Sequence, residues 1–139
     1  MISNPRTAVV VGAIALGLVS IPGYPKEMIK ATLLKNSTIQ LDTDRVKAGS
    51  VTFDVSNAAD TGMTHEFVVV KTDLAADKLP VENGKVPENQ FKKIGEVEDI
   101  APGTSKHMTL KLAPGHYVLF CNRPGHYSMG LHASLLVTP

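Results

Sequence analysis

The chain has 139 residues and a formal net charge of +1, with 43% hydrophobic and 19% charged residues. This length and composition are typical of one globular domain and exclude a disordered chain. The balance of 14 basic and 13 acidic residues, with no basic run interleaved with aromatic residues, excludes nucleic acid as a partner. The single cysteine, Cys121, excludes an intramolecular disulfide, so in an exported protein its thiol needs either burial or a metal.

Residues 1–22 differ in kind from the rest of the chain. Arg6 is the only charged residue before Lys26, and residues 8–21 are continuously apolar or small. A basic residue followed by an apolar run is typical of a secretory signal. The run is shorter than the roughly 20 residues that span a bilayer, so a removed signal is the first interpretation. No Ala-x-Ala cleavage site follows, which keeps a retained membrane anchor open, and only that anchor would bring the protein to a membrane.

From residue 29 onward, apolar residues recur with the period of two that is typical of β-strands. Val51, Phe53 and Val55, for example, share one face of a predicted strand. Such runs, separated by turns rich in Gly, Pro and Asn, predict strands at residues 29–33, 38–41, 51–55, 64–71, 109–112, 117–120 and 134–137. The pattern therefore predicts an all-β domain over residues 29–139, built as an antiparallel sandwich or barrel.

Residues 73–99 are the exception to this pattern. The segment contains Pro80, the dipeptide Asn83-Gly84 and Pro87, and its residues 74–79 favour a helical turn. A structureless connection of this length is uncommon in a compact domain. We therefore expect a surface excursion with one or two short helices that joins one sheet to the other. Its charges are mixed in sign, which favours a solvated face over a docking patch.

Three potential metal ligands stand at or near the ends of predicted strands. His65 opens one strand, Cys121 closes another, and His126 follows on a loop with a Pro-Gly turn. Two imidazoles and one thiolate form a soft, trigonal set that suits copper in a blue electron-transfer site. His107 and His116 fall at no ligand position, and His132, which is closer to the site, should point away from it as the neighbour of Leu131.

These residues also have ordinary interpretations. A lone buried cysteine is more often a small hydrophobe than a ligand, and a histidine that opens a strand is usually only solvated. Zinc would also bind a His2Cys set, but a structural zinc site usually has four protein ligands and a catalytic one an open water position. Cys121 and His126 form a weak nucleophile–base pair, because no third residue orients them. The three residues together favour copper, and we do not expect an enzyme.

Three short motifs carry a family resemblance: His65-Glu-Phe-Val-Val69, Pro114-Gly-His-Tyr-Val118 and Cys121-Asn-Arg-Pro-Gly-His126. They resemble the cupredoxins, the small blue copper proteins that include plastocyanin, azurin and amicyanin, and are similar above all to bacterial plastocyanin-like exported proteins. The likeness covers roughly residues 29–137. It implies a Greek-key β-sandwich and one type 1 copper, with His65, Cys121 and His126 as its equatorial ligands.

The axial position is where the sequence departs from this family. Relatives of this kind commonly read His-x3-Gly-Met, which would place methionine where this chain has Leu131. Met129, however, follows His126 at the His-x2-Met spacing of amicyanin-like loops. Two arrangements stay open. Either Met129 is a long axial thioether ligand, or Leu131 occupies the axial place beside a three-coordinate copper with a higher reduction potential.

Glu66 is a second departure, because many blue copper proteins have Asn after the first histidine, where it ties the two ligand loops together. Hydrogen bonds to the thiolate would then come from backbone N–H groups or from Asn122.

The expected function is one-electron transfer in the periplasm or another extracytoplasmic compartment. His126 would be the solvent-facing ligand. Redox proteins would dock on an apolar patch around it, formed by Pro124, Gly125, Tyr127, Met129 and Leu131. A periplasmic copper-binding or copper-delivery protein, serving homeostasis or resistance, is the alternative, and the sequence does not separate the two.

Overall fold

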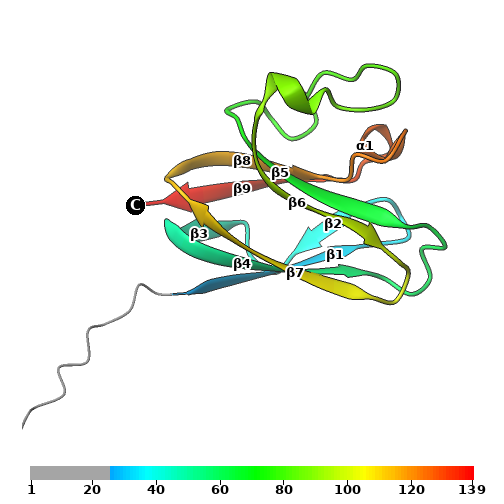
Figure 1. Cartoon of the computed structure of the whole chain (residues 1–139), viewed down its shortest axis with the longest axis horizontal. Helices are drawn as coiled ribbons and strands as arrows, with labels where there is room; N and C mark the ends of the chain where they lie inside the picture. The colour runs from blue at the N-terminus through cyan, green and yellow to red at the C-terminus, as the bar shows by residue number, and fades with distance from the viewer. Residues whose placement is uncertain (1–25) are drawn as a thin grey trace, which may run out of the picture.

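The computed structural model describes residues 26–139, so the expected signal or anchor at residues 1–22 lies outside the described part. The described chain forms two β-sheets packed face to face (Figure 1). In chain order the elements are β1 (Glu27–Leu33), β2 (Ile39–Leu41), β3 (Arg45–Lys47), β4 (Gly49–Asn57), β5 (His65–Lys71), the 3-10 helix η1 (Glu88–Gln90), β6 (Lys92–Ile100), β7 (Ser105–Leu112), β8 (Gly115–Phe120), α1 (His126–Met129) and β9 (His132–Thr138). Within residues 26–139, no helix is long and apolar enough to cross a bilayer.

The two sheets have the strand orders β2-β1-β4-β7 and β3-β9-β8-β5-β6. The expected all-β sandwich is therefore confirmed. The expectation that the pairing is antiparallel throughout is wrong at two places, because β1 pairs with β4 and β3 pairs with β9 in parallel. Parallel neighbours need a crossover connection rather than a hairpin. Here the chain leaves the first sheet after β2, adds β3 to the second sheet, and returns to form β4 beside β1 (Figure 1).

The main core lies between the two sheets and follows the alternation of the sequence. Val51, Phe53 and Val55 of β4 are fully buried on one face, and the same spacing of two carries Asn57 onto that face at the end of the strand. Asn57 is therefore a buried polar residue in a position that the hydrophobic pattern assigns to the core.

The central strands β5 and β8 are buried on both faces. Phe67 and Val69 belong to the main core, whereas Val68 and Val70 point the other way into a second apolar cluster. The remaining buried members of that cluster are Leu79, Val86, Val118, Phe120 and Tyr127. Continuous apolar runs are typical of strands that are covered on both faces. The cover over the outer face comes from residues 72–91 and from α1 (Figure 1).

The region between residues 73 and 99 differs from our expectation in two respects. Residues 92–100 form β6, which pairs with β5 in the same sheet, so the excursion is only residues 72–91 and does not join one sheet to the other. Its helical content is η1, and residues 74–79 form turns and bends rather than a helix. The strand escapes detection because two register shifts in the β5–β6 pairing interrupt the alternation of apolar and polar residues.

Candidate metal centre

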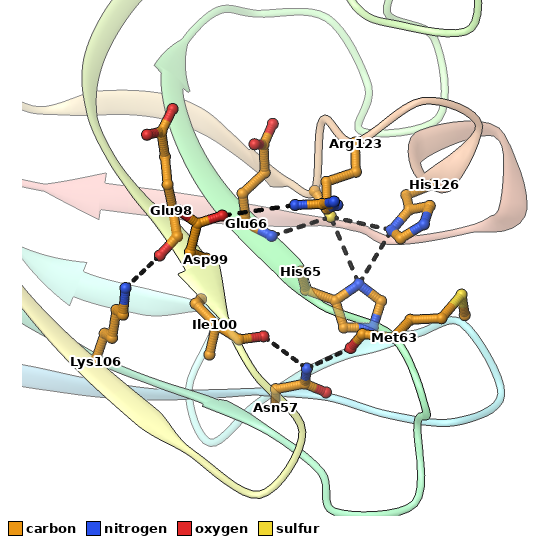
Figure 2. A network of polar contacts seen from close by, with 11 residues as sticks. Asn57, Met63, His65, Glu66, Glu98, Asp99, Ile100, Lys106, Arg123 and His126 are labelled. Carbon is orange, nitrogen blue, oxygen red and sulfur yellow. Dashed lines mark hydrogen bonds and ion pairs between the residues drawn. The ribbon is translucent and has the colours of Figure 1, made fainter.

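The structure brings the three predicted ligands together at one edge of the larger sheet. His65 is the first residue of β5, and Cys121 directly follows β8. Because β5 and β8 are antiparallel neighbours, the start of one lies beside the end of the other. His126 opens α1 after a turn in which Gly125 has a φ of 81°, a backbone conformation that favours glycine. Figure 2 shows the rings of His65 and His126 pointing toward one another.

The donor atoms of these residues form a compact triangle. Its sides are 3.1 Å between the two Nδ1 atoms, 3.4 Å from Cys121 Sγ to His126 Nδ1, and 3.7 Å from Cys121 Sγ to His65 Nδ1. The point equidistant from the three atoms lies about 2 Å from each, near the roughly 2.0–2.3 Å of metal–nitrogen and metal–thiolate bonds. The triangle therefore fits one transition-metal ion without rearrangement.

Both imidazoles are held in the neutral form that a metal requires. Burial, then the nearby His126 and Arg123, lower the pKa of His65 to about 4. Burial and Arg123 also lower the pKa of His126 below its ordinary value. A ligating histidine must offer a lone pair, so a lowered pKa keeps both Nδ1 atoms available at neutral pH. The other nitrogen of His65, Nε2, is buried and has no hydrogen-bond partner among residues 26–139. Packing, rather than a second hydrogen bond, therefore holds this ring.

The thiol of Cys121 is fully buried and protonated in the metal-free state. Burial raises its pKa, and the backbone N–H groups of Glu66 and Arg123 oppose that shift only in part. The Glu66 N–H group donates a hydrogen bond to Cys121 Sγ over 3.3 Å (Figure 2). We expected this bond to come from backbone N–H groups or from Asn122, and the structure shows the backbone. A metal that binds here must displace the thiol proton, and the N–H groups then stabilise the thiolate.

The cluster has three ligands of the His, Cys, Asp or Glu type within residues 26–139, and no fourth joins it. A structural zinc site is usually four-coordinate, whereas a trigonal His2Cys set is characteristic of blue copper. The donor chemistry therefore fits copper better than structural zinc.

The two candidates for the axial position lie in different surroundings. Leu131 is completely buried and belongs to the same apolar cluster as Cys121. Its carbonyl oxygen accepts a hydrogen bond from the Cys121 N–H group over 3.0 Å, and its own N–H group donates to the His126 carbonyl over 3.3 Å. Met129, at the end of α1, has an exposed fraction of 49%.

Asn57 holds the segments on either side of His65, and it was not identified from the sequence. Its Nδ2 group donates to the carbonyls of Met63 over 2.7 Å and of Ile100 over 2.8 Å (Figure 2), while its Oδ1 accepts from Thr61 Oγ1 over 2.6 Å. Ile100 pairs directly with His65 in the β5–β6 register. Asn57 thus ties the turn before the first ligand to the strand beside it, and its place in the period-two pattern of β4 is the signal that could have found it.

The expected apolar patch is smaller than the sequence suggested. Pro124 and Met129 are exposed and Gly125 is partly exposed, but Tyr127 and Leu131 are buried. Tyr127 therefore belongs to the interior of the loop rather than to its surface.

The other histidines lie outside the triangle of donors, as expected. His107 is exposed on β7 near Asp54, and His116 binds the carbonyl of Thr72 through Nδ1. His132 packs against the ring of Tyr127, with 5.1 Å between the ring centroids.

Solved structures of blue copper proteins share this fold. Auracyanin from Roseiflexus castenholzii matches 82% of this chain and 97% of its own length, at 24% identity and a TM-score of 0.51. The "blue" copper protein auracyanin A from Chloroflexus aurantiacus matches 82% of this chain and all 100% of its own, at 21% identity and a TM-score of 0.58. Rusticyanin from Thiobacillus ferrooxidans matches 81% of this chain and 77% of its own, at 16% identity and a TM-score of 0.55.

No family model and no curated protein sequence matches the chain. At identities below 25%, the structural matches establish the fold and nothing finer. The fold that the motifs predicted is confirmed: this chain has the cupredoxin fold.

Proposed function

We propose that this protein is a one-electron carrier that holds a single type 1 copper ion between His65, Cys121 and His126. The observation that carries the proposal is the triangle of two Nδ1 atoms and one Sγ atom, with sides of 3.1–3.7 Å, on a cupredoxin fold. Bound copper would supply a one-electron couple whose potential is tuned by its surroundings.

The chain's own part is to keep the donor atoms in place while the charge at the site changes. Two of the three ligands are fixed by the larger sheet, since His65 begins β5 and Cys121 follows β8, and both are almost completely buried. Densely packed interiors resist displacement. Little rearrangement would therefore oppose electron transfer, which distinguishes a carrier from a site that captures a metal by folding around it.

We infer that Leu131, rather than Met129, would lie beside a bound copper ion in the place of the family's axial ligand. Support comes from the burial of Leu131 in the cluster that contains Cys121, against the 49% exposure of Met129. An apolar axial neighbour donates no electrons to the metal, so the reduced form would be favoured and the reduction potential would be high.

Electrons would enter and leave at the partly exposed ligand, His126. Pro124 and Met129 are exposed on the same loop, and they would offer apolar contacts to a redox protein. The near-neutral charge of the chain supports a partner that recognises this small surface rather than a strong long-range field.

Copper delivery is the second candidate function that shares the same site. Handover to an acceptor requires ligands that a second protein can reach, and Cys121 has an exposed fraction of 0% and His65 of 1%. This burial supports electron transfer over delivery and over catalysis by Cys121, whose raised thiol pKa also disfavours a nucleophile.

The two functions are separated by comparing electron exchange with copper release. For a carrier we expect a reversible one-electron couple, rapid electron self-exchange, and slow loss of Cu(I) to a competing chelator. Slow self-exchange with ready transfer of Cu(I) to the chelator would overturn electron transfer and favour delivery.

We also propose that the protein works outside the cytoplasm. Support comes from the basic and apolar character of residues 1–22. Fractionation of cells that express the full chain, followed by mass determination of the mature form, would distinguish a removed signal from a retained anchor.

A further inference from the structure

The residues that directly follow the two loop ligands are both anchored to the same distant segment. Asn122 follows Cys121, Tyr127 follows His126, and the side chain of each bonds to the excursion at residues 72–91. This excursion lies beside α1 over the outer face of the larger sheet (Figure 1). The sequence predicts a solvated surface excursion over residues 73–99.

Asn122 pairs with the excursion as a backbone group would. Its Oδ1 accepts from the Val86 N–H group over 2.8 Å, and its Nδ2 group donates to the Val86 carbonyl over 2.9 Å and to Glu88 Oε2 over 2.7 Å. The amide offers two donor hydrogens and one acceptor oxygen, so each of these groups is engaged. The residue is 1% exposed. Its side chain therefore fixes the peptide that immediately follows Cys121.

Glu88 continues this link toward β6. Burial raises the pKa of its carboxyl, but the hydrogen bonds from Asn122 and Lys93 outweigh that effect and the pKa is lowered. The carboxylate is thus ionised at neutral pH, which strengthens the bond that it accepts from Asn122. Lys93 lies 3.0 Å from Glu88 and 2.8 Å from Glu96, so the acceptor of the Asn122 bond is itself held in position.

Tyr127 provides the second anchor. Its hydroxyl donates to the Ala76 carbonyl over 2.6 Å and accepts from the Leu79 N–H group over 2.9 Å. Its ring packs edge-on against Phe120, with 5.9 Å between the ring centroids. Because Tyr127 adjoins His126 in the first turn of α1, these contacts fix the ligand that would exchange electrons.

A third contact joins the two segments through their backbones. Asn83 and Gly84 form the tip of the excursion with φ values of 52° and 79°, the positive values that a two-residue type I′ turn requires. The turn is closed by the paired backbone bonds of Glu82 and Lys85. It presents the Gly84 carbonyl to the Gly125 N–H group over 2.8 Å, one residue before His126.

We propose that residues 72–91 are a clamp on the ligand loop, and that Asn122 and Tyr127 are positioning residues that hold Cys121 and His126 in their metal-binding geometry. The clamp holds the loop at Asn122, Gly125 and Tyr127, at both ends of the Cys–His interval. The inference rests on the proposed function for its purpose, but the clamp itself is a property of the metal-free chain. The two claims can therefore fail separately.

The direct test compares Tyr127→Phe with Tyr117→Phe. Each change removes one buried tyrosine hydroxyl that donates to a backbone carbonyl, Ala76 in one case and Ala113 in the other. Both keep the ring and its packing, so both variants are expected to fold. In the metal-free protein, we expect hydrogen exchange at the Gly125 amide to accelerate about tenfold in Tyr127→Phe, which corresponds to about 1.4 kcal/mol, and to stay unchanged in Tyr117→Phe. Equal exchange rates at Gly125 in the two variants would overturn the clamp.

The second readout uses the copper-loaded protein. Tyr127→Phe should release copper to a chelator several times faster than the unaltered chain, and its paramagnetic signal should broaden because the ligand positions vary, with neither change in Tyr117→Phe. Asn122→Ala should have larger effects of both kinds, since it removes all three bonds of that side chain. Unaltered release and unaltered signal in Tyr127→Phe would contradict its positioning role. Failure of the unaltered chain to bind copper would refute the proposed function and leave the exchange test to decide the clamp.

Discussion

At the scale of single residues, the site combines neutral bases with a protonated acid. The pKa values of His65 and His126 are lowered and that of Cys121 is raised, in each case chiefly by burial. Burial disfavours every charged form, so the metal-free site is neutral. On binding a metal ion, Cys121 would lose its thiol proton, and the thiolate would balance part of the charge of the metal.

The lowered pKa of His65 predicts how the stability of the metal-free protein depends on pH. An unfolded histidine takes up a proton as the pH falls through 6.5, whereas folded His65 does so only near 4. The contribution of neutral His65 to the free energy of unfolding is therefore fully present above pH 6.5 and is lost as the pH falls to about 4. The loss is at most roughly 3 kcal/mol for a shift of this size. Urea unfolding at several pH values measures it.

The matched variants for this measurement are His65→Gln and His107→Gln. The first should reduce the dependence on pH between 6.5 and 4, and the lowered pKa of His126 leaves part of it. The second removes an exposed histidine on β7, outside the metal centre, and serves as the comparison. Identical pH profiles in the two variants would contradict the account of His65.

The axial inference predicts opposite results for two substitutions in the loop. Leu131→Met introduces a thioether beside the copper and should lower the reduction potential, by about 59 mV for each 1.4 kcal/mol by which the oxidised form is favoured. Met129→Leu changes an exposed side chain and should leave the potential within a few millivolts of the original. Voltammetry of the two copper-loaded variants decides the matter: a potential that rises in Met129→Leu would assign the axial ligand to Met129.

At the scale of elements, strand ends carry the ligands and polar side chains hold those ends. Asn57, the last residue of β4, joins the turn before β5 to the end of β6 through its bonds to Met63 and Ile100. The first ligand is thus positioned by a strand of the opposite sheet. Cys121 and His126 are positioned by residues 72–91, which connect β5 and β6 in the larger sheet.

Removing the Asn57 side chain should therefore destabilise the whole domain. Asn57→Ala leaves the carbonyls of Met63 and Ile100 and the Thr61 hydroxyl without this partner, and buried unpaired groups of this kind cost about 2–4 kcal/mol together. Ser56→Ala is the control, because it removes only the exposed bond to Ser105 and should change stability by less than about 0.5 kcal/mol. Equal losses in the free energy of unfolding would contradict the role of Asn57.

The elements differ in how well the sequence predicts them. His65 and Cys121 could be found because each stands where an apolar run begins or ends, and His126 because it follows Cys121 on a short loop with a Pro-Gly turn. β6 could not be found by periodicity, because two register shifts break its alternation. The bonds of Tyr127 to Ala76 and Leu79 depend on the path of a segment without any period. Only burial distinguishes Leu131 from Met129 as the candidate for the axial position, and burial is a property of the folded chain.

At the scale of the whole molecule, the sandwich provides two cores with different tasks. The main core between the sheets contains Cys121 and Leu131. The second cluster lies beneath the excursion, on the outer face of the larger sheet, and contains Val86 and Tyr127. The loop that carries two of the three ligands contributes Cys121 to the main core and Tyr127 to the second cluster, and His126 is left partly exposed. This arrangement suits a carrier that must hold one geometry and still exchange electrons at its surface.

The central claim is that His65, Cys121 and His126 bind one copper ion as a type 1 site, and the electronic and paramagnetic spectra of the copper-loaded protein test it most directly. The account predicts one copper per chain and an intense blue colour from the copper–thiolate bond. It also predicts the narrow hyperfine splitting of such a site, and the loss of both spectral features in Cys121→Ser. A colourless copper-loaded protein, or a blue colour that survives in Cys121→Ser, would contradict it.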